Sequence, residues 1–281
     1  MLNPPPEAVF ARLVRAALLE DLGGGGDLTT DAIVAKDRVA DARIVARRGG
    51  TIAGLFLAHY VFVQLDGAVR FEMERDDGSS VRAGDTVATV SGNARAVLSG
   101  ERTALNFLGR LSGVASATRE LVERITGTGA RIVDTRKTTP GMRALEKYAV
   151  RCGGGQNHRF GLSDGILIKD NHLAVTGSIA DAVQAVRSSL GHLLKIEVEV
   201  DSIEQLRDVL HLPIDAVLLD NMPPERLREA VAIVNGRMLT EASGGITPQT
   251  VLDVAQSGVD LVSSGWITHS APALDLSLEL E

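Results

Sequence analysis

The segment KIEVEVDSIEQLRDVLHLPIDAVLLD (residues 195–220) decides the fold class of this chain. It begins with an apolar run at 195–200, passes through a helix-like stretch, and ends with a second apolar run at 215–219. Two strands joined by a helix are expected to be parallel, because the crossover brings the chain back to the starting end of the sheet. The segment therefore predicts a strand–helix–strand unit of an α/β fold.

The same rhythm continues on both sides of this segment. Further short apolar runs occur at 131–134, 165–169, 237–242 and 260–264, and helix-like stretches separate most of the runs. About six such units without a dinucleotide-binding glycine fingerprint favour a parallel α/β barrel over an open sheet.

The first part of the chain has a different pattern. Apolar residues at helical spacing cover residues 7–22 and end at a run of four glycines, residues 23–26. Strands are expected at 39–47, 69–74 and 86–90, and a long helix at 97–126. We therefore expect a small α+β domain over residues 1–112 and the barrel over residues 113–269.

Composition limits the possible classes of protein. The chain has 281 residues, is 44% hydrophobic and carries a formal charge of −7, which argues against a nucleic-acid-binding protein. The N-terminus lacks the pattern of a signal peptide, and no apolar run approaches the ~20 residues of a membrane span. The single Cys152 is expected to be a small buried side chain, and a reducing cytoplasm is the expected compartment.

Polar residues follow the predicted barrel strands at their carboxyl ends, where α/β barrels keep their active sites. Thr135, Arg136 and Lys137 leave the first strand, and Lys169 follows the second. His158 and Arg159 lie in a loop after three glycines, which favours ligand binding over a core role for the histidine. Arginine forks suit planar carboxylates, so these residues predict a site for a polycarboxylate or phosphate.

Carboxylates and glycine turns follow the later strands. Glu197 and Glu199 are two residues apart, so both are expected to face the barrel interior; Glu199 is the better candidate for the open site, whereas Glu197 could instead be a paired core charge. Asp220 ends its strand, and with Glu199 it could bind ribose hydroxyls or magnesium. Two loops suggest phosphate cradles: Ser243–Gly244–Gly245, before a helix expected near Pro248, and Ser263–Ser264–Gly265.

Three of these features allow another interpretation. Arg143, Lys147 and Arg151 are spaced as solvated charges on one helix face. Lys137 or Lys169 could serve a Schiff-base lyase as an amine nucleophile. The stretch VRAGDTVATVSG (residues 81–92) reads like a lipoyl-type hairpin, but no lysine lies between Lys36 and Lys137 to carry the cofactor.

Several motifs together resemble the quinolinate phosphoribosyltransferase family over nearly the whole chain. They are EDLGGGGDLTT (20–30), SGERTALNFLGRLSG (99–113), DTRKTTPGMRALEKYAV (134–150), GGGQNHRFGLSDGILIKDNH (153–172), IEVEV (196–200), LLDN (218–221), ASGG (242–245) and THS (268–270). A molybdenum-transport-associated relative of the same fold is the nearest alternative. The intact TRKTTPG and GGGQNHR segments favour the quinolinate enzymes.

The resemblance implies an activity and an assembly. Members convert quinolinate and 5-phosphoribosyl 1-pyrophosphate (PRPP) to nicotinate mononucleotide, pyrophosphate and carbon dioxide, with Mg²⁺, in de novo NAD biosynthesis. It implies an N-terminal α/β sandwich, an incomplete α/β barrel, and a tail over residues 270–281 that returns to the N-terminal domain. It further implies a homodimer in which each active site is shared between two subunits.

The resemblance also implies roles for individual residues. Quinolinate would be bound by Arg102 of a second subunit and by Thr135, Arg136, Lys137, His158, Arg159 and Lys169. PRPP would be bound by Lys137, Lys169, Glu199, Asp220, Ser243, Gly244, Gly245, Ser264 and Gly265. Lys137, Glu199 and Asp220 would be catalytic, and the two carboxylates would hold Mg²⁺, directly or indirectly. Directly after the second phosphate loop, this chain has Trp266 where members of the family usually have a small or polar residue.

Overall fold

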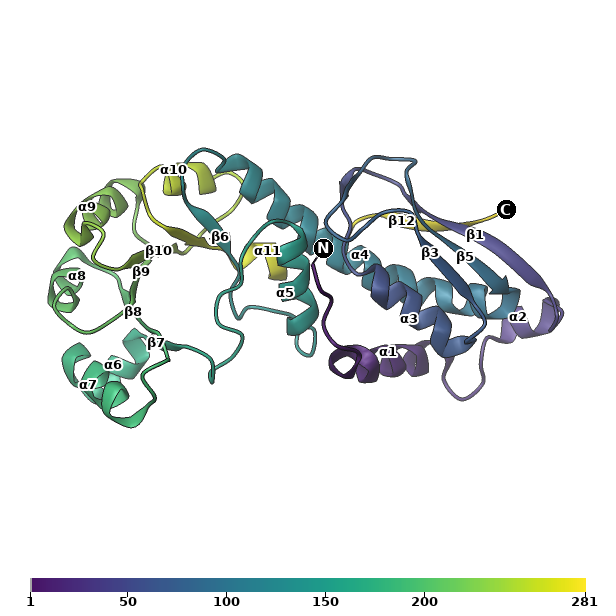
Figure 1. Ribbon diagram of the computed structural model, residues 1–281, viewed down its shortest axis with the longest axis horizontal. Helices are drawn as coiled ribbons and strands as arrows, with labels where there is room; N and C mark the ends of the chain where they lie inside the picture. The colour runs from purple at the N-terminus through teal and green to yellow at the C-terminus, as the bar shows by residue number, and fades with distance from the viewer. Residues whose placement is uncertain (1) are drawn as a thin grey trace. The chain divides into compact units, whose positions relative to one another are not determined.

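A computed structural model describes residues 2–281 and divides them into two compact units (Figure 1). The N-terminal unit comprises the chain up to Arg119 together with Thr139–Gly154 and Ser270–Glu281. The barrel unit comprises Glu120–Thr138 and Gly155–His269. The segment Thr139–Gly154 thus belongs to the N-terminal unit, although it follows the first barrel strand along the chain.

An antiparallel sheet of four strands, in the order β12-β1-β5-β3, organises the N-terminal unit. Its strands are β1 (Val39–Ala46), β3 (Arg70–Met73), β5 (Thr86–Asn93) and β12 (Leu276–Leu280), and a separate pair is formed by β2 (Gly50–Thr51) and β4 (Ser80–Val81). In β1, Ala42 and Ile44 are buried while Asp41 and Arg43 are exposed, which is the alternation of a half-buried strand. The tail closes one edge of the sheet, because β12 pairs antiparallel with β1.

Helices cover one side of this sheet (Figure 1). They are α1 (Glu7–Leu22), α3 (Leu55–Leu65) and α4 (Ala94–Arg124); the unit also contains α2 (Leu28–Ile33) and α5 (Arg143–Cys152). α1 buries Phe10, Val14 and Leu18 on one stripe and ends at Gly23, whose φ of 54° suits glycine. The expected strands and the helices at 7–22 and 97–126 are confirmed to within a few residues.

Three side chains of α5 can be compared with the expectations from the sequence. Cys152 is buried and unpaired with another cysteine, as expected, and burial raises the pKa of its thiol to about 12, with Asp77 adding to the effect. Lys147 was expected to be solvated, but it is buried, whereas Arg151 is exposed. The spacing of 4 residues placed these side chains on one face, and that face is only partly open to solvent.

Six parallel strands form the sheet of the barrel unit, in the order β6-β11-β10-β9-β8-β7. They are β6 (Arg131–Val133), β7 (Ile166–Ile168), β8 (Ile196–Val200), β9 (Ala216–Asp220), β10 (Leu239–Ser243) and β11 (Leu261–Ser263). Each expected apolar run is a strand. β7 ends the sheet on one side, and on the other side β6 is followed by a single bridge from Val133 to Gln156. The predicted incomplete α/β barrel, with an N-terminal α+β sandwich, is therefore confirmed.

Helices follow the barrel strands and lie outside the sheet (Figure 1). They are α6 (Asp170–Thr176), α7 (Ile179–Ser189), α8 (Ile203–Val209), α9 (Pro224–Val234) and α10 (Val251–Ala255). The short helix α11 (Trp266–His269) instead lies at the carboxyl ends of the strands. Ser178 and Ser202 cap the starts of α7 and α8 by accepting main-chain N–H groups, which limits where these helices can begin. None of the helices in residues 2–281 is both long and apolar enough to cross a bilayer.

Candidate active site

The carboxyl ends of the barrel strands surround a cavity of about 530 Å³. Twelve residues singled out from the sequence line it: Thr135, Arg136, Lys137, His158, Arg159, Lys169, Glu199, Asp220, Ser243, Gly244, Gly245 and Gly265. The wall also contains Ser263, which belongs to the second expected phosphate loop, as well as Trp266 and His269, which were not assigned a role. The parallel topology explains this convergence, because all six strands end at the same edge of the sheet.

A buried carboxylate connects the first strand to the glycine loop. Asp134 follows β6 directly and is 0% exposed. Its carboxylate accepts the side-chain amide of Asn157 at 2.7 Å and the main-chain N–H of His158 at 2.8 Å. Asp134 therefore holds the loop that carries His158 and Arg159 against the end of β6.

Two guanidinium groups lie near each other in the cavity wall. Burial lowers the pKa of Arg159, and the positive charge of Arg136 lowers it further. Arg159 donates from Nη1 to the carbonyl of Gly165 at 3.0 Å, which orients the guanidinium group. Two like charges held together in this way form a site for an anion with more than one negative charge.

Lys137 is anchored through its main chain. Its N–H donates to Thr135 Oγ1 at 3.0 Å, and its carbonyl accepts the hydroxyl of Thr268 at 2.8 Å. A Cβ atom at Gly265 would lie 3.0 Å from Cδ of Lys137 and 3.1 Å from the ring of His269. The absence of a side chain at Gly265 thus leaves room for Lys137 in the cavity.

Acidic groups occupy the neighbouring strand ends. Lys169 and Glu199 form an ion pair, and the Glu199 side chain is 14% exposed. Asp220 accepts the side-chain amide of Asn221 at 2.6 Å. Carboxylate oxygens at two adjacent strand ends, β8 and β9, match the hard oxygen donors that Mg²⁺ prefers.

The glycine loop after β10 packs against Asn221. The N–H of Asn221 donates to the carbonyl of Ser243 at 2.8 Å, and a Cβ atom at Gly244 would lie 2.1 Å from Asn221 Oδ1. Gly244 and Gly245 have φ of 103° and 62°, which favour glycine. The expected helix near Pro248 begins only at Val251, so the turn itself, rather than a helix N-terminus, faces the cavity.

Two predicted residues do not line the cavity. Ser264 is 1% exposed; its hydroxyl donates to the carbonyl of Ile246 at 3.0 Å, and its N–H donates to the carbonyl of Val133. Its neighbour Ser263 lines the cavity instead. Arg102 lies in the N-terminal unit on α4 and is exposed.

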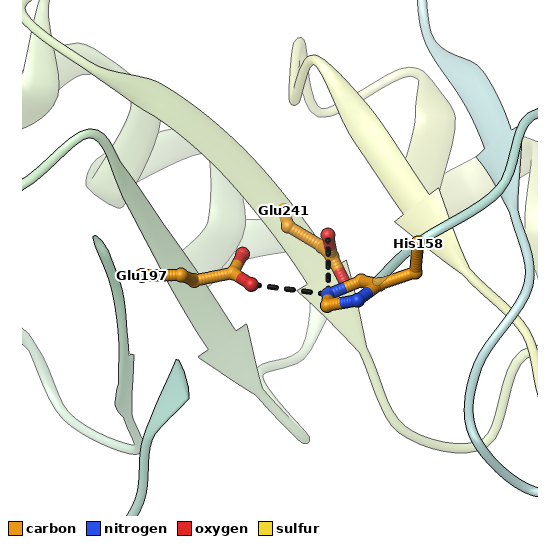
Figure 2. A group of neighbouring side chains, drawn as sticks. All are labelled: His158, Glu197 and Glu241. Carbon is orange, nitrogen blue, oxygen red and sulfur yellow. Dashed lines mark hydrogen bonds and ion pairs between the residues drawn. The ribbon is translucent and has the colours of Figure 1, made fainter. Parts of the chain in front are cut away.

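A buried acidic pair lies beside His158 (Figure 2). Nε2 of His158 is 3.0 Å from Glu197 Oε2 and 3.6 Å from Glu241 Oε2. Glu197 is thus a paired charge of the barrel interior, and its partner is a histidine. Burial raises the pKa of Glu241 to about 7, and the charge of Glu197 raises it in the same direction.

Glu241 was missed in the sequence, although a signal was present. It precedes Ser243 by two residues in the strand LTEAS, which is the same spacing that placed Glu197 beside Glu199. Side chains two residues apart in a strand point to the same side, so Glu241 and Ser243 both face the inside of the barrel, with Glu241 farther from the carboxyl end of β10. Asp134 was noticed only as part of the strand end, because its partners Asn157 and His158 are more than 20 residues away along the chain.

Comparison with known proteins assigns the chain to a family. The model described as "Quinolinate phosphoribosyl transferase, N-terminal domain" matches residues 27–112, and that for the C-terminal domain of the same family matches residues 114–279. A probable nicotinate-nucleotide pyrophosphorylase [carboxylating] of Bacillus subtilis (strain 168) is 44% identical over 269 residues, which cover 96% of this chain and 92% of the relative.

Solved structures agree with these sequence matches. NadC from Streptococcus pyogenes superposes with a TM-score of 0.95 at 39% identity, covering 99% of both chains. The nicotinate-nucleotide pyrophosphorylase from Francisella tularensis has the same TM-score of 0.95 and the same 39% identity, and covers 100% of this chain and 99% of its own. With both halves of the chain matched and the cavity in the barrel built from the family's motifs, the chain belongs to the quinolinate phosphoribosyltransferase family.

Proposed function

We propose that this chain transfers the phosphoribosyl group of PRPP to quinolinate with loss of carbon dioxide, giving nicotinate mononucleotide and pyrophosphate in NAD biosynthesis. The enzyme is accordingly a pentosyltransferase. Support comes from the family to which it belongs and from the names of its relatives, which include a quinolinate phosphoribosyltransferase [decarboxylating] of Nicotiana tabacum at 38% identity over 300 residues.

One observation carries the proposal: the cavity is divided by charge. Cationic groups from β6, β7 and the glycine loop form one part, and the ends of β8, β9 and β10 contribute carboxylates and a glycine turn to the other. A substrate pair made of a dicarboxylate and a sugar phosphate fits such a division, because each partner meets groups of suitable charge and hydrogen-bonding type.

The cationic part would bind quinolinate. We assign Arg136 and Arg159 to its two carboxylates, since two neighbouring guanidinium groups are stabilised by a dianion. Lys137, Lys169, Thr135 and His158 complete this wall. Their task is to orient the ring nitrogen toward the anomeric carbon of PRPP, which converts an encounter between two substrates into a positioned reaction.

The acidic part would bind the ribose and phosphate of PRPP. Glu199 and Asp220 face the cavity and would hold ribose hydroxyls and Mg²⁺, directly or through water, whereas the Ser243–Gly245 turn and Gly265 would receive the 5-phosphate. Ser264 supports this loop through its bonds to Ile246 and Val133. When bound, Mg²⁺ supplies positive charge that offsets the charge developing on the departing pyrophosphate.

The chemistry needs no nucleophile from the protein. The quinolinate nitrogen attacks the anomeric carbon, and pyrophosphate leaves with the electron pair of the broken C–O bond. Positive charge that develops on the ribose is stabilised by Glu199 and Asp220, while Lys137 faces the same cavity as a cation. The bond between the ring and the carboxylate next to the new N-ribosyl bond then breaks, and carbon dioxide leaves. The electron pair stays on that ring carbon, where the adjacent positive nitrogen stabilises it, and the carbon takes up a proton from water to give nicotinate mononucleotide.

The alternatives have less support. A Schiff-base lyase needs an uncharged amine, but Lys169 is ion-paired with Glu199, and Arg136 and Lys137 are adjacent cations. The molybdenum-transport-associated relative lacks any particular observation in its favour. The homodimer with Arg102 contributed by the second subunit, and the cytoplasmic location, remain proposals that rest on the family motifs and on the single unpaired cysteine.

A direct assay tests the proposed function. The purified protein is mixed with MgCl₂, PRPP and either quinolinate or nicotinate, and nicotinate mononucleotide and carbon dioxide are followed. We expect both products from quinolinate, none from nicotinate, and loss of activity when EDTA replaces MgCl₂. Product from nicotinate but not from quinolinate would overturn the proposal.

A further inference from the structure

The hydrogen bonds of His158 fix the position of its proton. The main-chain N–H of Arg159 donates to Nδ1 of His158 at 2.7 Å. An amide N–H can only donate, so Nδ1 must present its lone pair. In a neutral imidazole, the proton is then on the other ring nitrogen, Nε2. In an imidazolium ion, Nδ1 would also carry a proton, and two N–H donors, of Nδ1 and of Arg159, would face each other unfavourably. The geometry therefore points to the neutral ring with its proton on Nε2.

Nε2 of His158 faces the acidic pair described above (Figure 2). Glu197 Oε2, at 3.0 Å, lies at hydrogen-bonding distance, whereas Glu241 Oε2, at 3.6 Å, is too far for a normal bond. Glu197 thus accepts the Nε2–H proton. Both ring nitrogens of His158 are used within the protein, so the ring presents a face or edge, rather than a free nitrogen, to the cavity.

Glu241 supports Glu197 from deeper in the barrel. Its side chain is 2% exposed, and one carboxyl oxygen, Oε1, is buried without a hydrogen-bond partner in the described structure. Two adjacent carboxylates in a buried site are stable only if one is neutral or a cation joins them. The neutral acid of Glu241 can donate a hydrogen bond to the carboxylate of Glu197, which leaves a single charge in the pair.

We propose that Glu197 and Glu241 are positioning residues that hold His158 as its Nε2–H tautomer, and that His158 in this state fixes the main chain of Arg159 in the cavity wall. The order of donors is consistent throughout: Glu241 donates to Glu197, His158 donates to Glu197, and Arg159 donates to His158. The proposed role in quinolinate binding rests on the proposed function, but the tautomer does not.

A metal ion is the main alternative for this cluster. The donor atoms of His158, Glu197 and Glu241 lie within 4.8 Å of one another, which is close enough to surround a cation. A metal on Nε2 needs the lone pair there, however, and a neutral ring would then carry its proton on Nδ1, against the Arg159 N–H. The bond between Arg159 and His158 therefore disfavours a metal and favours the tautomer proposed here.

The first measurement reads the tautomer directly and does not depend on activity. Protein labelled with ¹⁵N-histidine is dialysed against EDTA, and the ring signals of His158 are identified by their loss in His158→Gln. We expect a protonated Nε2 and an unprotonated Nδ1 at neutral pH, with no change on adding ZnCl₂ or MnCl₂ in equimolar amount. A proton on Nδ1, an imidazolium ion, or metal binding at Nε2 would each overturn the proposal.

The second measurement uses two changes at Glu241. Glu241→Gln keeps a donor toward Glu197, so its KM for quinolinate is expected to stay within about 3-fold of the parent, whereas Glu241→Leu removes the donor and is expected to raise that KM by about 10-fold or more. The KM for PRPP should change by less than about 2-fold in both. If Glu241→Gln and Glu241→Leu raise the KM for quinolinate equally, or if either variant changes the KM values for quinolinate and PRPP equally, Glu241 is not a positioning residue for the quinolinate site.

The two experiments separate the failure of this inference from failure of the proposed function. If the parent does not turn over quinolinate, the function is wrong, and the ring signals of His158 still decide the tautomer. If the parent is active but the tautomer differs, only the present inference falls. Circular dichroism of each variant confirms that altered kinetics do not reflect unfolding.

Discussion

Arg136 is the residue at which binding of a dicarboxylate can be tested most directly. It is exposed in the cavity wall, and its charge is one cause, after burial, of the lowered pKa of Arg159. A dianion relieves this repulsion, so the pair should bind quinolinate more strongly than either arginine alone. We expect Arg136→Ala to lower kcat/KM for quinolinate by about 100-fold or more in steady-state assays.

A matched control comes from the opposite end of the same strand. Arg131 is also exposed, but it begins β6, whereas Arg136 follows the carboxyl end of that strand. Arg131→Ala should keep kcat/KM within about 2-fold of the parent. Retention of nearly full activity by Arg136→Ala, or equal loss in both variants, would remove Arg136 from the quinolinate site.

Glu241 should make the stability of the barrel unit depend on pH. Its pKa is raised from 4.5 to about 7 by burial first and by the charge of Glu197 second, while a hydrogen bond with Ser263 acts in the opposite direction. Between these values the folded state binds more protons than the unfolded state, so the unfolding free energy falls as pH rises from about 4.5 to 7. The stabilisation that comes from the raised pKa of Glu241 is fully present below about pH 4.5 and is lost above about pH 7.

The Glu241→Gln variant tests this pH dependence. Glutamine cannot ionise, so the fall in urea midpoint between pH 5 and pH 7 should be smaller in the variant than in the parent, by circular dichroism at about half-unit steps of pH. Glu204→Gln serves as a control, because Glu204 is at the first turn of α8 and lies outside the acidic pair. Parallel pH curves for parent and Glu241→Gln would contradict the prediction.

Residue types and strand ends were enough to predict most of the residues that line the cavity, but not the buried residues that hold them in place. Arg136, Lys169, Glu199 and Asp220 were predicted because each lies at or just beyond the carboxyl end of an apolar run. Asp134 and Glu241 act through partners that are distant along the chain, and burial gives them their roles. No local pattern reports such a partner, although the alternation in β10 would have placed Glu241 on the inner face.

At the scale of elements, the turn after β10 depends on one glycine. Gly244 has a φ of 103°, and a Cβ atom there would lie 2.1 Å from Asn221 Oδ1. Gly244→Ala must therefore displace Asn221 or the turn, and both lie beside Asp220. We expect the KM for PRPP to rise by about 10-fold or more, with a smaller effect on the KM for quinolinate.

Gly236→Ala separates this clash from backbone strain alone. Gly236 has a φ of 72°, and nothing lies within 4 Å of a Cβ atom placed there. Its replacement should cost about 1 kcal/mol of stability, measured by urea unfolding, and leave both KM values unchanged. If Gly236→Ala raises the KM for PRPP as much as Gly244→Ala does, the effect does not come from the turn at Asn221.

Elements with a clear period were predictable, and one element without a period was missed. The barrel strands are short apolar runs bounded by polar residues, and α1 shows a clear apolar stripe. α3, with the sequence LFLAHYVFVQL, was not predicted, because it is apolar on nearly all sides and buries Leu55, Leu57 and Val61 within two turns. Such a segment has no polar face to reveal its helical period.

At the scale of the whole molecule, the cations of the cavity belong to the barrel unit, whereas Arg102 belongs to the N-terminal unit. Arg102 is exposed on α4, which leaves it accessible to a second copy of the chain. In the function proposed above, Arg102, which lies in the motif SGERTALN (residues 99–106), binds the carboxylates of quinolinate in the neighbouring subunit. A shared site of this kind makes each subunit dependent on its partner.

Mixing two inactive variants tests the shared site. Arg102→Ala and Arg136→Ala are each expected to lose about 100-fold in kcat/KM. If subunits exchange at random, half of the dimers contain one copy of each variant, and one of their two sites receives both arginines intact. Mixing equal amounts under exchange conditions should then restore about one quarter of the parent activity. Arg102→Ala alone, taken through the same exchange procedure, is the control. If the mixture is no more active than the two variants separately, either Arg102 and Arg136 of one chain serve the same site or Arg102 is not part of the site.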